Sequence, residues 1–219
     1  MNETHAASQL ALAPLRIDEL LERLSSSDPV PGGGSAAALA GAVGASLVSM
    51  VAALTVGRDA YADVEAEARE IGEAASGLRD QLVALADEDS IAYQAYMDAR
   101  RLPRQTETER AARARAMEGA AVQAADVPLR TARVAREVLE LARRIAPMGN
   151  RNAVSDAGVA ALLTSAAIRG AVLNVRINLP QLPEGAPLQR QVSEELPQLE
   201  ADAAALEAAA LADVSARLG

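Results

Sequence analysis

The chain has 219 residues, half of them apolar, and its 21 basic and 30 acidic residues give a net charge of −9. This length is enough for one domain with a sizeable core, and so high an apolar fraction excludes a disordered chain. The acidic balance argues against a nucleic-acid partner. The absence of cysteine excludes disulfides and thiol chemistry. The first residues show no signal-peptide pattern, so a cytoplasmic protein is expected.

The composition favours helices over strands. Phe and Trp are absent and Tyr occurs three times, so alanine and leucine fill most apolar positions. Both are strong helix formers, whereas strands prefer β-branched and aromatic residues. The composition therefore predicts an all-α fold, a single-domain helical bundle of about six helices without a sheet. It is expected to span residues 15–219 behind a flexible N-terminal tail, residues 1–14.

The first predicted helix, residues 17–24, precedes a long uncharged run between Asp28 and Arg58. That run is long enough to cross a membrane. Its many alanines, glycines and serines gain little in hydrocarbon, however, and no aromatic residue flanks it. A buried central helix from about Ser35 to Val56 is favoured, and no membrane partner is expected. One helical stripe is large (Leu39, Val43, Leu47, Met50, Leu54) and another is small (Ala37, Gly41, Gly44, Val48, Ala52).

A third helix, ended by Pro103, carries an apolar seam at alternating spacings of four and three residues, which is typical of helices that pack against helices. The seam contains Val64, Ala68, Ile71, Ala75, Leu78, Leu82, Leu85, Ala92 and Tyr96. Asp89 interrupts it. A carboxylate there is at a solvated edge, paired with an arginine, or catalytic. Tyr93 lies one turn further on and is placed to hydrogen-bond it, while Asp87 and Glu88 fall off the seam and are expected to be solvated.

The fourth helix should begin at a capping box formed by Thr106 and Glu109 and end near Gly149, with a kink or break at Pro128. A fifth helix is expected to follow, capped by Ser155 or Asp156.

A last amphipathic helix should run to the C-terminus, after a proline-rich loop and with a kink at Pro197. Its predicted buried side consists of Leu199, Ala203, Leu206 and Ala210.

Few residue types are available for catalysis. The only histidine, His5, falls in the predicted tail. Without cysteine or an internal histidine, zinc clusters and histidine-activated nucleophiles are nearly excluded, and no metal site is expected. Proton transfer would use Asp, Glu, Tyr or Arg.

Three polar segments are candidate binding sites. The glycines of PGGGS, residues 31–35, either give a flexible start to a helix or offer backbone N–H groups to an anionic or carbonyl oxygen. GNRNAVSD, residues 149–156, has Asn150 and Asn152 beyond its capping needs. NVRIN places Asn174 and Asn178 on one helical face, where they either hold the following loop or contact a ligand.

Four segments in order, PGGGSAAALAGAVGASLVSMV, DEDSIAYQAYMDARRLPRQTETE, GNRNAVSDAGVAALL and NVRINL, resemble the cyclodeaminase domain of formiminotransferase-cyclodeaminase. That family includes free-standing bacterial methenyltetrahydrofolate cyclohydrolases. The likeness runs from about Ile17 to the C-terminus and implies an all-α homodimer with a folate substrate. It implies that Asp89 is catalytic, and Arg104 stands where the family commonly has lysine. The residues that would line the folate site are Gly32, Gly33, Gly34, Ser35, Asn150, Ser155, Asp156, Asn174 and Asn178.

The reaction implied by the resemblance converts 5-formiminotetrahydrofolate to 5,10-methenyltetrahydrofolate with release of ammonia, without a metal or redox cofactor. The alternative is methenyltetrahydrofolate cyclohydrolase, which opens the same ring with water. A non-catalytic helical assembly protein that keeps the fold is a third possibility. Because an acidic protein needs local positive charge to attract an anionic ligand, Arg58, Arg104 and Arg176 are expected to bind the glutamate tail.

Overall fold

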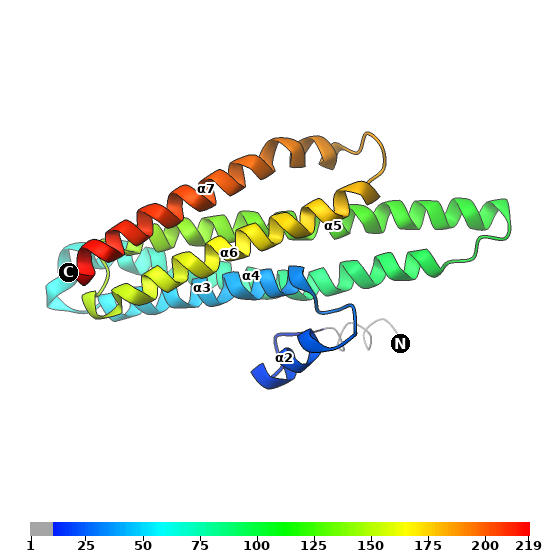
Figure 1. The fold of residues 1–219 in the computed structure, drawn as a ribbon. Helices are drawn as coiled ribbons and strands as arrows, with labels where there is room; N and C mark the ends of the chain where they lie inside the picture. Colours follow the sequence, from blue (N-terminus) through cyan, green and yellow to red (C-terminus); the bar gives the residue numbers. More distant parts are fainter. Residues whose placement is uncertain (1–10) are drawn as a thin grey trace.

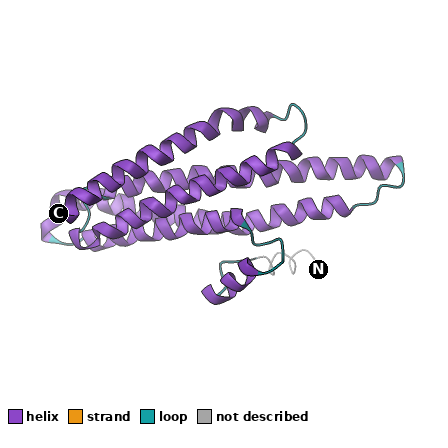
Figure 2. Ribbon diagram, in the orientation of Figure 1, coloured by secondary structure: helices purple, strands orange, loops and turns teal. Residues whose placement is uncertain are grey.

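A computed structural model describes residues 11–219, which form α-helices and contain no strand (Figures 1 and 2). His5 and the first ten residues of the predicted tail lie outside the described part. The α-helices are α2 (Ile17–Ser25), α3 (Gly33–Thr55), α4 (Glu65–Arg101), α5 (Glu107–Ile145), α6 (Val154–Asn178) and α7 (Pro187–Leu218). Short 3-10 helices span Asp59–Val64, Arg151–Ala153 and Leu179–Gln181. The predicted all-α fold class is confirmed.

The core lies among α3, α4, α5 and α6, and α7 packs on α5 and α6 (Figure 1). The ends of α4 and α5 that meet at the 102–106 loop project beyond α3 and α6 (Figure 1). The short α2 lies beside the bundle. Just before it, Leu12 is buried and its backbone N–H donates to Asp87 Oδ1 at 2.7 Å. Residues that precede α2 therefore already pack on α4.

The small face of α3 is its buried face. A side chain at Gly44 would collide with Thr164 and the Ala160 carbonyl of α6, and one at Gly170 of α6 would press on Ala37 of α3. These pairings show that α3 and α6 run antiparallel at close range, because their small residues allow it. The small face is thus used inside the chain.

Two helical stretches, α3 and Arg151–Gln181 around α6, are long and apolar enough to cross a membrane by length and composition alone. About half of each is buried against other helices, as in the core helices of a bundle. The large stripe of α3 faces outward in part, with Val43, Met50 and Leu54 exposed.

The predicted seam of α4 is confirmed at most of its apolar positions. Seven of them are buried, namely Ala68, Ile71, Ala75, Leu78, Leu82, Leu85 and Ala92. Beside the seam, Asp87 and Glu88 are half-buried and bonded, contrary to the expectation that they are solvated. Asp87 accepts the Leu12 N–H bond, and Glu88 pairs with Arg130 of α5 at 2.6 Å.

Pro128 does not split the fourth helix, since α5 continues from Glu107 to Ile145 with Pro128 buried inside it. A proline removes the N–H that would bond to the carbonyl four residues earlier. That carbonyl belongs to Ala124, and the side-chain amide of Asn178 donates to it at 2.7 Å. The amide supplies the missing donor, so the helix continues. Pro197 likewise lies inside the continuous α7.

The predicted cap of α6 is also wrong. The helix begins at Val154, so Ser155 and Asp156 already lie within it, and the N-cap residue Ala153 makes no side-chain cap. The chain is instead turned by the short helix before it, where Asn150 Oδ1 accepts the Asn152 N–H at 3.0 Å.

Candidate active site

Asp89 lies on α4 against the first turn of α3. The Ser35 hydroxyl is 2.9 Å from Asp89 Oδ2, 3.0 Å from the Ala86 carbonyl and 3.1 Å from the Ser90 hydroxyl. Ser35 and Ser90 are both buried. The backbone N–H groups that open a helix have no partner within it and favour a negative charge nearby. The start of α3 therefore holds the one carboxylate that interrupts the seam.

Burial raises the pKa of Asp89 above its ordinary value of 3.8, and the hydrogen bonds from the Ser35 hydroxyl and backbone N–H act in the opposite direction. The balance leaves the carboxylate a better proton acceptor than an exposed aspartate. A carboxylate with a raised pKa suits general acid–base catalysis near neutral pH. Asp89 has no arginine partner among residues 11–219, so the ion-pair interpretation of the seam break is not supported.

The absence of a side chain at Gly34 is required by this arrangement. A Cβ atom there would overlap the Asp89 carboxylate. At Gly33 a Cβ would only reach ordinary contact, 3.4 Å from the side-chain amide of Asn174. The two neighbouring glycines thus differ. Gly34 allows α3 and the carboxylate to approach each other, and Gly33 faces α6.

A pocket of about 720 Å³ opens over the carboxylate, between α3, α4, α5 and α6. It is lined by Asp89 with Gly32, Gly33 and Gly34, and also by Arg100, about three helical turns further along α4, and by Arg113 of α5. Apolar and aromatic side chains line the space between, among them Tyr93, Tyr96, Met97, Met117 and Ile177. The hydroxyl of Tyr93 makes no hydrogen bond to Asp89, contrary to the interpretation of its one-turn spacing.

Asn174 and Asn178 line the same pocket from α6. The Asn174 amide nitrogen donates to the Gly170 carbonyl at 2.9 Å, and that of Asn178 donates to the Asn174 and Ala124 carbonyls. Carbonyls accept only, so these bonds fix which end of each amide is nitrogen. Each amide keeps its oxygen as an acceptor for a ligand. The amides thus bond backbone carbonyls of α6 and α5 rather than the following loop, and a role in contacting a ligand stays a prediction.

Asn150, Ser155 and Asp156 are not part of this pocket. Thr55 Oγ1 accepts the Asn150 N–H at 2.8 Å, and the Asn150 amide donates to the Leu54 carbonyl at 2.7 Å, at the far end of α3. Twenty residues separate Thr55 from Ser35, which is about 30 Å along a helix. Asp156, at the start of the antiparallel α6, therefore lies at that far end and not beside Asp89.

The three arginines expected to bind the anionic tail are also elsewhere. Arg58 Nε donates to the Leu54 carbonyl at 2.8 Å, at that same far end. Arg176 pairs with Glu200 of α7 at 2.7 Å. Arg104 lies in the loop after α4 and does not line the pocket.

If Asn150 is structural, replacing it with alanine should lower stability and leave turnover per folded molecule unchanged. The variant loses two bonds from a buried side chain, which should reduce the free energy of unfolding by about 1–3 kcal/mol. Urea denaturation followed by circular dichroism measures this. Asn152→Ala, at an exposed neighbouring residue, is the matched control and should change neither quantity. A loss of activity in folded Asn150→Ala would contradict the assignment.

Arg100, Arg113 and Gln181 were not predicted from sequence. Arg100 and Arg113 belong to an arginine-rich stretch that is typical of a solvated helix face, and only the pairing of α4 with α5 selects these two. The Tyr96 side chain is held in the pocket by its hydroxyl, which donates to Gln181 Oε1 at 2.7 Å. The sequence did contain one pattern from which the position of Arg100 could have been predicted. Asp89, Tyr93, Tyr96 and Arg100 recur at helical spacing and so share a face of α4.

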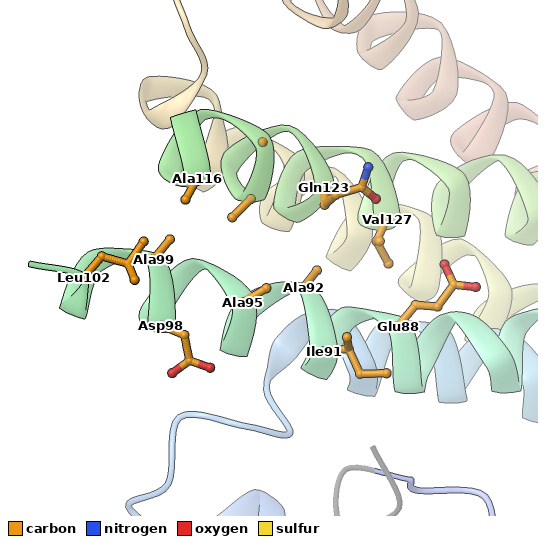
Figure 3. A pocket seen from close by; sticks show the side chains of 12 residues that line it. Glu88, Ile91, Ala92, Ala95, Asp98, Ala99, Leu102, Ala116, Gln123 and Val127 are labelled. Atoms are coloured by element: carbon orange, nitrogen blue, oxygen red, sulfur yellow. The ribbon is translucent and has the colours of Figure 1, made fainter. Parts of the chain in front are cut away.

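A second pocket of about 570 Å³ lies on a different face of α4. Figure 3 shows Ala92, Ala95 and Ala99 of α4 opposite Ala116, Gln123 and Val127 of α5. Its walls are mostly small apolar side chains. Neither Asp89 nor the start of α3 lines it. Of these two pockets, only the first therefore contains the Asp89 carboxylate.

The fold and the site define an all-α protein with a half-buried carboxylate at a glycine-rich helix start. Residues 16–198 match the family described as formiminotransferase-cyclodeaminase. A methenyltetrahydrofolate cyclohydrolase of Methylorubrum extorquens is 46% identical over 87% of this chain and 91% of its own length. The chain belongs to the formiminotransferase-cyclodeaminase family.

Two further relatives agree with this assignment. The formimidoyltransferase-cyclodeaminase of Mus musculus is 36% identical over 69% of this chain, a match that spans 28% of the mouse protein. The crystal structure of formiminotetrahydrofolate cyclodeaminase from Thermotoga maritima superposes with a TM-score of 0.83 at 28% identity, covering 94% of this chain and 99% of that one. The relatives are enzymes of folate one-carbon chemistry.

Proposed function

We propose that the chain opens or closes the 5,10-methenyl ring of tetrahydrofolate, with Asp89 as the proton-transfer group. The observation that supports this proposal is the half-buried Asp89 carboxylate in a pocket lined by the start of α3 and the amides of α6. The 46% identity with a cyclohydrolase over nearly the whole of both chains favours the reaction with water. The ammonia-releasing reaction, placed first by the motifs, is the second candidate, since the Thermotoga maritima structure carries that name.

In the reaction with water, the water oxygen attacks the methenyl carbon and a proton passes to the Asp89 carboxylate. Asp89 then returns that proton to N5 as the carbon–N5 bond breaks. The hydroxyl proton leaves to solvent as the formyl group forms on N10. One carboxylate that alternates between base and acid is sufficient for both steps.

In the second candidate reaction, N10 attacks the carbon of the protonated formimino group, which becomes an amine, and the N10 proton passes to Asp89. The tetrahedral adduct then collapses as Asp89 protonates the departing nitrogen, and ammonia leaves. Holding N10 against the carbon contributes by proximity. The two reactions place the same proton demands on the same side chain.

Turnover of the purified protein on 5-formimino- and 5,10-methenyltetrahydrofolate, followed side by side by the methenyl absorbance, tests this proposal. We expect the protein to consume the methenyl substrate faster than it forms methenyl product from the formimino substrate. The reverse order would select the ammonia-releasing reaction. No turnover of either substrate and no folate-induced rise in Tm would contradict both and leave a non-catalytic assembly protein.

A homodimer is part of this proposal, through a different surface from the small Ala/Gly face. That face is buried in the chain, whereas the outward sides of α3 and α6 expose large apolar side chains. The exposed fractions are 52% for Val43, 47% for Leu162 and 64% for Leu173. Exposed apolar patches of this kind mark interaction surfaces. A second copy packed there, and a cytoplasmic location, stay predictions.

We expect Val43→Glu with Leu162→Glu to convert a dimer to a monomer in sedimentation velocity, because each places a charge in an apolar contact. Ala112→Glu, on an exposed face of α5, is the matched control and should remain dimeric. A wild-type chain that sediments as a monomer at micromolar concentration would contradict the dimer.

A further inference from the structure

We infer that Arg100 and Arg113 form an anion-binding end of the Asp89 pocket, where they hold the glutamate carboxylates of the folate and set the preference for tail length. This inference rests on the proposed function and deepens it. It assigns the two residues a positioning and specificity role, apart from proton transfer.

A bond between helices holds the Arg113 guanidinium at the end of α4 that carries Arg100. Arg113 of α5 donates from Nε to the backbone carbonyl of Arg100 at 3.2 Å, in the last turn of α4. That carbonyl has no partner within its own helix. The bond fixes the Arg113 side chain beside Arg100, and it leaves the two terminal nitrogens of Arg113 available. Both residues line the pocket.

Neither guanidinium has an acidic partner among residues 11–219. Most other arginines there do, as Arg130 has Glu88 and Arg133 has Glu195. In a chain of net charge −9, an anionic ligand is repelled unless a local cation attracts it. Two unpaired arginines at one end of a pocket supply that attraction, and their planar forks match carboxylates.

The spacing also fits. Eleven residues separate Asp89 from Arg100, which is about 16 Å along α4 and close to three full turns, so both face the same side. Helical side chains lean toward the helix N-terminus, which brings the Arg100 guanidinium back toward Asp89. In a folate, roughly 10 Å separates N10 from the first glutamate carboxylate, by ordinary covalent bond lengths. The Arg100 side chain, which extends toward Asp89, makes up the difference between these two distances.

The lining between the two ends suits the middle of that ligand. Met97 and Met117 contribute flexible, polarisable side chains, and Tyr93 contributes a ring. Such groups favour an aromatic ring such as the aminobenzoyl part of folate. Acceptors at one end, apolar walls in the middle and cations at the other end follow the order of groups along the substrate.

The test compares kcat and KM of Arg100→Gln and Arg113→Gln with the wild type. The substrates are 5,10-methenyltetrahydrofolate with one glutamate, the same compound with five, and the tetrahydropteroate analogue that lacks glutamate. Arg101→Gln and Arg115→Gln are matched controls, because they remove neighbouring charges that do not line the pocket. Circular dichroism confirms that each variant is folded.

For the glutamate-bearing substrates, we expect each pocket variant to raise KM roughly 10-fold at little change in kcat, which is the effect of losing one charge-assisted hydrogen bond. KM for the analogue without glutamate should be equal in all five proteins. Equal KM values for every substrate, with an active wild type, would overturn the inference and leave the proposed function intact. A wild type inactive on every folate would instead overturn the proposed function.

Discussion

Replacing Asp89 with asparagine is expected to lower kcat by about 10²–10⁴-fold, the usual contribution of a general acid–base. Asparagine keeps the shape of the side chain and its place beside Ser35. It removes the carboxylate that accepts the proton and returns it. Folate affinity should change little, because the walls of the pocket are intact. Stopped-flow measurement of methenyl turnover and calorimetric titration with a folate measure the two quantities separately.

The same variant should be as stable as the wild type or more stable near neutral pH. Burial raises the pKa of Asp89 in the folded state, so its protonated form contributes stability that is present in full below the unfolded pKa. That contribution is lost as pH rises through the folded pKa. The neutral amide of the variant does not titrate and has no such loss. The Tm of the variant should therefore exceed that of the wild type by an amount that grows with rising pH and vanishes in strong acid.

A structural Asp89 would behave differently. Asp89→Asn would then unfold at lower temperature and turn over normally per folded molecule. That outcome would contradict the catalytic assignment.

Replacing Gly34 with alanine is the second large effect that we expect. The new methyl group would occupy the position of the Asp89 carboxylate. The carboxylate is the movable end of a side chain, so it should rotate away and lose its Ser35 bonds while the helices stay in place. Misplacing a catalytic group by about 1 Å can cost on the order of 10²-fold in rate. We therefore expect a loss of that size in kcat with a small change in Tm.

Gly77→Ala is the matched control for this variant. It lies on the same α4 helix as Asp89, and a Cβ there meets nothing within 4 Å. It should leave kcat unchanged and raise stability by up to about 1 kcal/mol through helix propensity. Gly33→Ala should have a smaller effect, on folate binding, because its methyl would only contact Asn174. A normal kcat in Gly34→Ala would contradict the packing of the carboxylate against α3.

Helix periodicity predicted most of the fold. The seam of α4 was predictable position by position because a helix that packs on other helices repeats its apolar residues strictly, and the same regularity exposed Asp89 as the exception. Predictions from the local sequence failed where a group from another helix changed the outcome. Pro128 is tolerated because Asn178, on another helix, supplies the missing donor, and no rule about proline in isolation anticipates that.

The site was predictable where its residues sit next to one another or share a motif, and not where packing decides. Gly34 and Asn174 were named from sequence and line the pocket, and Ser35 was named and bonds Asp89. Asn150 was named for its surplus polarity, yet a buried amide at a turn uses that polarity to join helices. Choosing among the arginines required the register of α5 on α4, which the sequence of either helix alone does not contain.

The most direct test of the account is the pH dependence of kcat for 5,10-methenyltetrahydrofolate, measured for the wild type and Asp89→Asn. The proton acceptor must be ionised, so the rate should fall as pH drops through the pKa of Asp89. Because burial raises that pKa above 3.8, the acid limb should lie at higher pH than for an exposed aspartate, and it should be absent in Asp89→Asn. The same acid limb in both proteins would contradict Asp89 as the proton-transfer group.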